Sequence, residues 1–119
     1  MPIDIEFDRI LSIGINYVGT KSELNGCLND IINLRKNTTT KKRIIMSELS
    51  QNKNLIPTKK NILNQIKEFV KDVGPNEKLL FQYSGHGYFT RDHTSDEKDG
   101  RDETICPLDY EKSGDISDD

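Results

Sequence analysis

Residues 79–87 read Leu-Leu-Phe-Gln-Tyr-Ser-Gly-His-Gly, an apolar run that ends in a histidine between two glycines. The run from Lys78 to Tyr83 predicts a strand that rises out of a core, and the glycines predict a sharp turn after it. Histidine changes its charge near neutral pH, so His86 at a strand end suits general acid and base chemistry. A hairpin turn that happens to contain a histidine is the structural alternative.

The residues before this run alternate between strand-like and helix-like patterns. Strands rich in Ile and Leu are expected at residues 9–16 and 43–46. Apolar residues at helical spacing occupy residues 25–36, and they recur after Thr58, which is a suitable helix cap, until Gly74 and the following proline stop the helix. Strand, helix, strand, helix, strand is typical of an α/β fold with a parallel sheet covered by helices.

A parallel topology brings distant residues together at one edge of the sheet. In such sheets ligands bind outside the carboxyl ends of the strands. The segments after the first and third strands emerge at the same edge. The turn at Gly26–Cys27 and the imidazole of His86 are therefore expected near each other.

The composition excludes several classes of protein. The chain has 119 residues, of which 33% are hydrophobic and 31% charged, which fits one domain. Its net charge is −3 and it has no basic cluster, so nucleic acid is not an expected partner. The apolar runs are too short for a membrane span, and the first residues lack a signal-peptide pattern. Cys27 and Cys106 form no disulfide or zinc pattern, so a reducing, cytoplasmic setting is expected, with Cys106 in the core.

Residues 14–22 nearly spell a phosphate-binding loop between a strand and a helix. Thr20 shifts Lys21 out of register with the phosphate cradle of such loops. The third strand also ends without an aspartate that would hold magnesium. Nucleotide binding is therefore not expected.

Three blocks of sequence carry a resemblance to a known family. They are residues 23–30 (Glu-Leu-Asn-Gly-Cys-Leu-Asn-Asp), 83–87 (Tyr-Ser-Gly-His-Gly) and 99–110 (Asp-Gly-Arg-Asp-Glu-Thr-Ile-Cys-Pro-Leu-Asp-Tyr). In this order they resemble the metacaspases, which are caspase-like cysteine peptidases, over about residues 9–119. The resemblance implies a single partial domain over residues 1–119, with a core from about residue 7. The expected domain is the amino-terminal half of a caspase-like parallel sheet with strand order 2-1-3.

The resemblance also implies roles for individual residues. His86, with Gly87 beside it, matches the histidine that activates the cysteine nucleophile of the family. Cys27 matches a secondary cysteine near the active site; it is either a reactive thiol at a helix N-terminus or, as we favour, a small residue packed under the loop. Asp30 and Ser84 match the pocket for the substrate side chain, where a carboxylate selects Lys or Arg. The alternative for Asp30 is an ordinary carboxylate on a helix surface.

Residues 88–119 are polar and acidic, and we expect a surface loop region there with one short strand. Asp102, Asp118 and Asp119 match a calcium site that activates many members of the family, and carboxylate oxygens are the ligands that Ca²⁺ prefers. A further ligand of that site lies beyond residue 119. A solvated acidic loop is the alternative.

The sequence as a whole favours a calcium-dependent cysteine endopeptidase that cuts peptides after Lys or Arg. The nucleophile of the family lies in a block after the last residue of this chain, so these 119 residues are expected to be inactive alone. The sheet edge beside the His86 strand is expected to be open to a carboxyl-terminal half or to a related chain. The alternative is a non-catalytic interaction or regulatory module, or a truncated gene product.

Overall fold

The computed structural model describes residues 5–91, 101–114 and 116–117. Within these residues the backbone forms strands, α-helices and one 3-10 helix. Their order is β1 (Ile5–Gly14), α1 (Cys27–Asn37), β2 (Thr38–Ser47), η1 (Lys53–Leu55), α2 (Lys59–Val70), β3 (Leu79–Ser84), β4 (Gly87–Arg91), β5 (Arg101–Ile105), α3 (Tyr110–Ser113) and β6 (Ile116–Ser117). None of the helices described is both long enough and apolar enough to cross a membrane.

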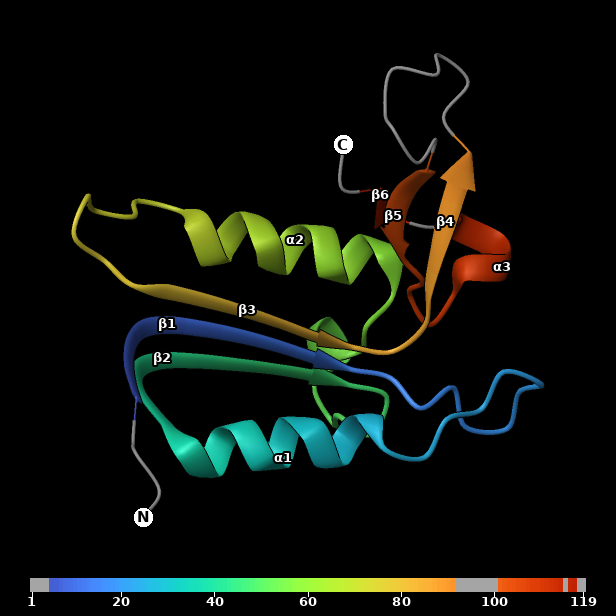
Figure 1. Cartoon of the computed structure of the whole chain (residues 1–119), viewed down its shortest axis with the longest axis horizontal. Coiled ribbons are helices and arrows are strands. Elements are labelled where there is room, and N and C mark those ends of the chain that lie inside the picture. The colour runs from blue at the N-terminus through green and yellow to red at the C-terminus, as the bar shows by residue number, and fades with distance from the viewer. Residues whose placement is uncertain (1–4, 92–100, 115, 118–119) are drawn as a thin grey trace.

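The first three strands form a parallel sheet in the order β2-β1-β3, which confirms the predicted α/β fold and strand order. Figure 1 shows α1 and α2 on opposite sides of this sheet, with the three strands pointing the same way. The central strand β1 is covered on both faces, because Ile10 to Ile13 are all at most 1% exposed. A run of consecutive buried residues, apolar here except for Ser12, is typical of a central parallel strand.

Helices α2 and α1 pack against opposite faces of β1 in different ways. Leu11 and Ile13 belong to a buried cluster with Ile62 and Phe69 of α2. On the other face α1 comes so near that a Cβ atom at Gly14 would lie 2.1 Å from Cδ1 of Ile31. Gly14 therefore sets the distance between α1 and the carboxyl end of β1.

The first two strands have different bounds from those predicted, because β1 begins at Ile5 rather than at residue 9. The second strand was expected over residues 43–46, but β2 begins at Thr38, directly after α1. Its first residues pair with the start of β1, in the register Ile5 with Thr38 to Phe7 with Thr40. β-branched threonines fit a pleated strand, so the polar segment extends the sheet once β1 lies beside it.

The expectation of a loop with one short strand after residue 87 was wrong. β4, β5 and β6 form a second, antiparallel sheet, in which Gly87 lies opposite Ile105. β5 consists of Arg-Asp-Glu-Thr-Ile and shows no strict alternation of apolar and polar residues. Its strand conformation depends on hydrogen bonds to β4, which is a non-local cause that a local pattern does not reveal.

The helix α2 begins as predicted and ends earlier than predicted. The Thr58 hydroxyl accepts a hydrogen bond from the Asn61 N–H at 3.3 Å, so Thr58 is the N-cap. The last helical residue is Val70, four positions before Gly74. Glycine therefore does not end this helix.

Arg9 of β1 binds the segment that ends α2. Its guanidinium donates to the carbonyl oxygens of Phe69 (3.0 Å), Lys71 (2.6 Å) and Asp72 (3.5 Å), and it forms an ion pair with Glu77 at 3.4 Å. A cation here satisfies carbonyl groups that the helix leaves unpaired and complements the helix dipole. The position where α2 ends is thus set by a side chain about sixty residues away in the sequence.

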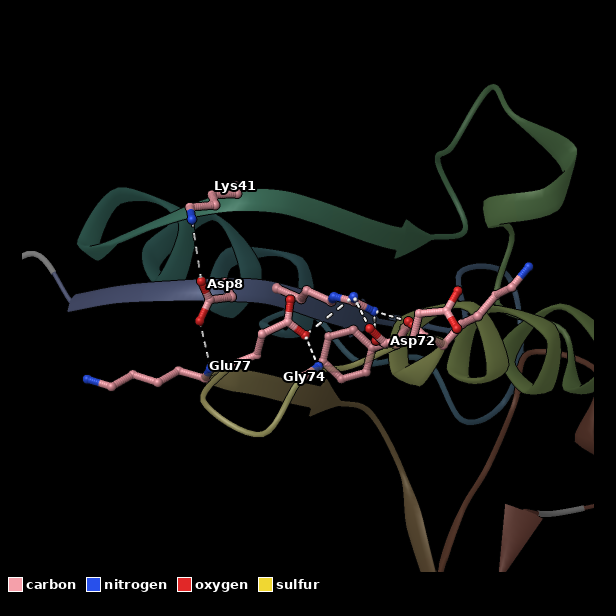
Figure 2. A network of polar contacts seen from close by, with 9 residues as sticks. Asp8, Lys41, Asp72, Gly74 and Glu77 are labelled. Atoms are coloured by element: carbon pink, nitrogen blue, oxygen red, sulfur yellow. Dashed lines mark hydrogen bonds and ion pairs between the residues drawn. The ribbon is translucent and has the colours of Figure 1, made fainter.

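Figure 2 shows that this network continues along the amino ends of the strands. The Glu77 carboxylate accepts from the Gly74 N–H at 3.0 Å, and the Asp8 carboxylate accepts from the Lys78 N–H at 2.7 Å. Asp8 also pairs with Lys41 at 3.8 Å. The network joins β1, β2 and the start of β3 at the end of the sheet opposite to His86.

Candidate active site

His86 follows β3 at the carboxyl edge of the parallel sheet, and its ring is bound by the loop that follows β1. The Nε2 atom lies 2.6 Å from the carbonyl oxygen of Ser22. A carbonyl oxygen only accepts hydrogen bonds, so the neutral ring carries its proton on Nε2 and leaves Nδ1 free of hydrogen. The ring therefore presents Nδ1 as a base, in a defined tautomer.

The main chain of His86 is fixed as firmly as its ring. Its N–H donates to the Tyr17 hydroxyl at 3.0 Å, and its carbonyl accepts from the Tyr83 hydroxyl at 2.5 Å and from the Cys106 N–H at 3.2 Å. The Tyr17 and His86 rings also pack together, with centroids 4.8 Å apart. Residues from β3, the β1–α1 loop and the second sheet thus hold one histidine in place.

The glycine before His86 has a packing role. A Cβ atom at Gly85 would lie 2.6 Å from the Tyr83 hydroxyl oxygen and 3.0 Å from that of Tyr17. The absence of a side chain leaves room for the two hydroxyl groups that bind His86. Gly87 on the other side is exposed and begins β4, opposite Ile105.

The buried Tyr17 and the half-buried Tyr83 form a polar pair next to His86. Their hydroxyl oxygens are 3.0 Å apart, and the Tyr17 hydroxyl also donates to the Cys106 carbonyl at 2.6 Å. Burial raises the pKa of Tyr17 from 10.0 to about 12, partly offset by its hydrogen bonds with Tyr83 and His86. Burial, followed by the hydrogen bond with Tyr17, also raises the pKa of Tyr83. Both hydroxyl groups therefore stay protonated as donors at neutral pH.

These raised pKa values predict a loss of stability in alkali. Above pH 10 the unfolded chain ionises Tyr17 while the folded chain keeps the proton to about pH 12, so stability falls as pH rises through this window. Over the whole window the difference corresponds to roughly 3 kcal/mol for Tyr17 alone. Urea unfolding between pH 8 and pH 11.5 measures it. The decline should be shallower in Tyr17→Phe, and an identical pH dependence in the two proteins would contradict the assignment.

Asp30 and Ser84, predicted from separate blocks of sequence, lie together in the structure. The Ser84 hydroxyl donates to the Asp30 carboxylate at 2.6 Å, and the Gln82 side chain donates to the Asp30 carbonyl at 3.2 Å. Asp30 lies in the first turn of α1 and is exposed. Within the described residues it forms no ion pair, so its negative charge is available to a ligand.

Both cysteines are buried and free of disulfides. Cys27 begins α1 at 7% exposure, and its N–H donates to the Asn16 side-chain oxygen at 3.0 Å. Cys106 is fully buried, as the sequence predicted. The burial of Cys27 favours a packed residue over an exposed nucleophile.

The side chains of the three predicted calcium ligands lie outside the described part of the structure. Asp118 and Asp119 lie outside the described residues, and only the backbone of Asp102, in β5, is described. Among the described residues no group of three or more His, Cys, Asp or Glu side chains is placed to hold a metal ion.

Sequence reasoning missed three residues that hold the site together, namely Tyr17, Ser22 and Glu48. Tyr17 and Ser22 lie in the segment considered only as a phosphate loop, and Glu48 follows β2 directly. A signal for Glu48 existed, because a polar residue just after a parallel strand lies at the ligand-binding edge. Ser22 acts through its carbonyl, so no side-chain pattern points to it.

A family profile described as "Metacaspase, peptidase C14 domain" matches residues 8–119. The chain belongs to the metacaspase family. Metacaspase-1 of Schizosaccharomyces pombe is 43% identical over 117 residues, which cover 93% of this chain and 28% of that protein. Metacaspase-1 of Ajellomyces capsulatus is 44% identical, covering 93% of this chain and 33% of that protein. This metacaspase chain therefore spans a third or less of these two curated relatives.

A solved structure supports the same arrangement of strands and helices. The crystal structure of a protein from Geobacter sulfurreducens superimposes on this metacaspase chain with a TM-score of 0.58 and 26% sequence identity. The match covers 99% of this chain and 42% of the other. The fold to which this parallel sheet belongs is thus also seen by crystallography.

Proposed function

We propose that this domain supplies the base and the substrate pocket of a cysteine endopeptidase that cuts after Lys or Arg. The observation that carries the proposal is the Ser84–Asp30 hydrogen bond at the same sheet edge as His86. An exposed carboxylate held in a fixed orientation favours a basic substrate side chain and repels an acidic one. Membership of the metacaspase family supplies the reaction class.

His86 performs both proton transfers in this reaction. As base, its Nδ1 atom accepts the proton of a thiol whose sulfur attacks the scissile carbonyl carbon. As acid, the resulting imidazolium returns that proton to the leaving amine as the peptide bond breaks. The Ser22 carbonyl stabilises the imidazolium because it already accepts the Nε2 hydrogen.

The thiol that His86 serves is proposed to come from outside these 119 residues. Cys106 is fully buried and Cys27 is 7% exposed, so neither is presented to a peptide. Calcium dependence through Asp102, Asp118 and Asp119 is part of the same proposal, on sequence grounds. A cytoplasmic location suits a chain in which Cys27 and Cys106 form no disulfide within the described residues.

A second candidate function is a binding module that pairs through the edge of β3. Within the described residues β3 pairs with β1 alone, and Phe81 on this strand is 41% exposed. An unpaired strand edge with apolar side chains favours addition of a further strand. This function predicts that the chain associates with a carboxyl-terminal segment of a relative. It also predicts that any peptide cleavage by that assembly does not depend on Asp30.

Peptide cleavage by two proteins tests the proposal. One is the chain alone; the other, termed the chimaera, carries the chain in place of the matching segment of the Schizosaccharomyces pombe relative. With Ca²⁺ the chimaera should cleave an arginine peptide and not an aspartate peptide, while the chain alone should cleave neither. Asp30→Asn should lower kcat/KM for the arginine peptide by about 10²-fold, because the substrate charge loses its partner.

Matched variants decide the outcome. Glu68→Gln removes an exposed carboxylate from α2 and should leave kcat/KM unchanged. A folded chimaera that cuts after aspartate, or that tolerates Asp30→Asn, would contradict the proposed pocket. Cleavage by the chain alone that is lost in Cys27→Ala and kept in Cys106→Ala would identify Cys27 as the nucleophile.

A further inference from the structure

Glu48, which follows β2, binds the turn that follows β1. Its carboxylate accepts hydrogen bonds from three consecutive backbone N–H groups, those of Asn16, Tyr17 (3.0 Å) and Val18 (2.9 Å). Convergent N–H groups of this kind form a concave site for an anion. A side chain of the protein itself fills this site, in the segment that resembles a phosphate loop.

The turn that Glu48 binds is an unfavourable one for the residue at its centre. Tyr17 adopts a φ of 56°, in the left-handed region, although it is a bulky residue and only 1% exposed. Three hydrogen bonds to a charged acceptor offset the cost of this conformation. Without the carboxylate, the turn would lose the acceptor for three N–H groups and would relax.

The turn at residues 16–18 supports the part of the β1–α1 loop that binds the His86 ring. The Tyr17 carbonyl accepts from the Thr20 hydroxyl at 2.7 Å, and the same hydroxyl oxygen accepts from the Ser22 N–H at 3.1 Å. The Ser22 carbonyl then accepts from Nε2 of His86. An unbroken series of hydrogen bonds therefore connects Glu48 to the imidazole through the β1–α1 loop.

A second connection runs through the Tyr17 side chain. Its hydroxyl accepts from the His86 N–H at 3.0 Å, and its ring packs against the imidazole. The conformation at Tyr17 decides where this side chain points. Glu48 thus affects both the ring and the main chain of His86 without touching either.

We propose that Glu48 is a positioning residue that holds His86 in the Nε2–H tautomer, with Nδ1 available as the base. The catalytic meaning of this tautomer rests on the proposed peptidase function. The positioning itself is a property of the chain and is measurable without activity. A failure of the positioning role of Glu48 is therefore distinguishable from a failure of the proposed peptidase function.

The test is the tautomer ratio of the His86 ring, read from its imidazole ¹⁵N chemical shifts at a pH where the ring is neutral. The sequence has two histidines, so His93→Ala leaves His86 as the single source of signal. In this background the Nε2–H form should predominate. Glu48→Ala should lower the ratio of Nε2–H to Nδ1–H by about five-fold, the preference that one net hydrogen bond provides.

Two further variants separate positioning from stability. Glu77→Gln removes a different glutamate that also accepts a backbone N–H, at the opposite end of the sheet, and should leave the tautomer ratio unchanged. Glu48→Gln keeps the size of the side chain and should shift the ratio in the same direction as alanine. An unchanged ratio in folded Glu48→Ala overturns the proposal. Unfolding of Glu48→Gln under conditions where Glu77→Gln stays folded also overturns it, in favour of a purely structural role.

Discussion

Replacing His86 by alanine is expected to lower kcat/KM of the chimaera for an arginine peptide by about 10⁴-fold. In the proposed reaction the imidazole is the single group that carries both proton transfers, and no water held at this position would have the same basicity. The main-chain hydrogen bonds of residue 86 to Tyr17, Tyr83 and Cys106 do not involve the side chain. The fold should therefore survive, and the loss should appear in kcat.

The control for this prediction is a change that removes a different histidine. His93 lies outside the described residues. The variant His93→Ala should keep kcat/KM within about two-fold of the value for the unchanged chimaera. Circular dichroism of both variants checks that the fold is intact. Retention of a tenth or more of the activity in folded His86→Ala would show that another group is the base.

Alanine at Gly85 is expected to destabilise the chain by about 3 kcal/mol, as overpacking a filled site does. The added Cβ would meet the hydroxyl oxygen of Tyr83 at 2.6 Å and that of Tyr17 at 3.0 Å. Both rings are anchored by hydrogen bonds to backbone carbonyls, so neither moves without breaking a contact to His86 or Cys106. Equilibrium unfolding in urea measures the loss.

Gly26→Ala is the matched control. A Cβ at Gly26 has no atom within 4 Å, and its φ of −122° is open to any residue. This variant should change stability by less than about 0.5 kcal/mol. Equal stabilities for the two alanine variants would mean that the tyrosine hydroxyls do not fill the space beside Gly85.

Much of the fold was predictable because its signals are local. A strand rich in Ile and Leu on both of its faces is typical of a strand covered on both sides, and β1 is such a strand. Thr58 predicted the start of α2, because a cap is a contact between near neighbours in the chain. The end of α2 was not predictable in this way, because Arg9 binds its last carbonyls from a distant strand.

The candidate site likewise contains residues that local patterns predict and residues whose role depends on distant contacts. His86, Asp30 and Ser84 carry chemistry in their own side chains and stand in recognisable blocks, so the sequence was enough to propose them as candidates. Their relation did not follow from those blocks: Ser84 donates to Asp30 because α1 packs beside the end of β3. Tyr17 went unrecognised because its role depends on a turn whose conformation is fixed by a residue from another strand.

Patterns within the chain were enough to predict the parallel sheet, its covering helices and a candidate histidine at its carboxyl edge. These features depend on the period of apolar residues and on neighbours a few positions apart. The tautomer of His86, the lack of space for a side chain at Gly85 and the groups that Glu48 binds follow from the folded structure. Each of these depends on hydrogen bonds between segments that are far apart in the chain, and such bonds exist only after the strands have paired.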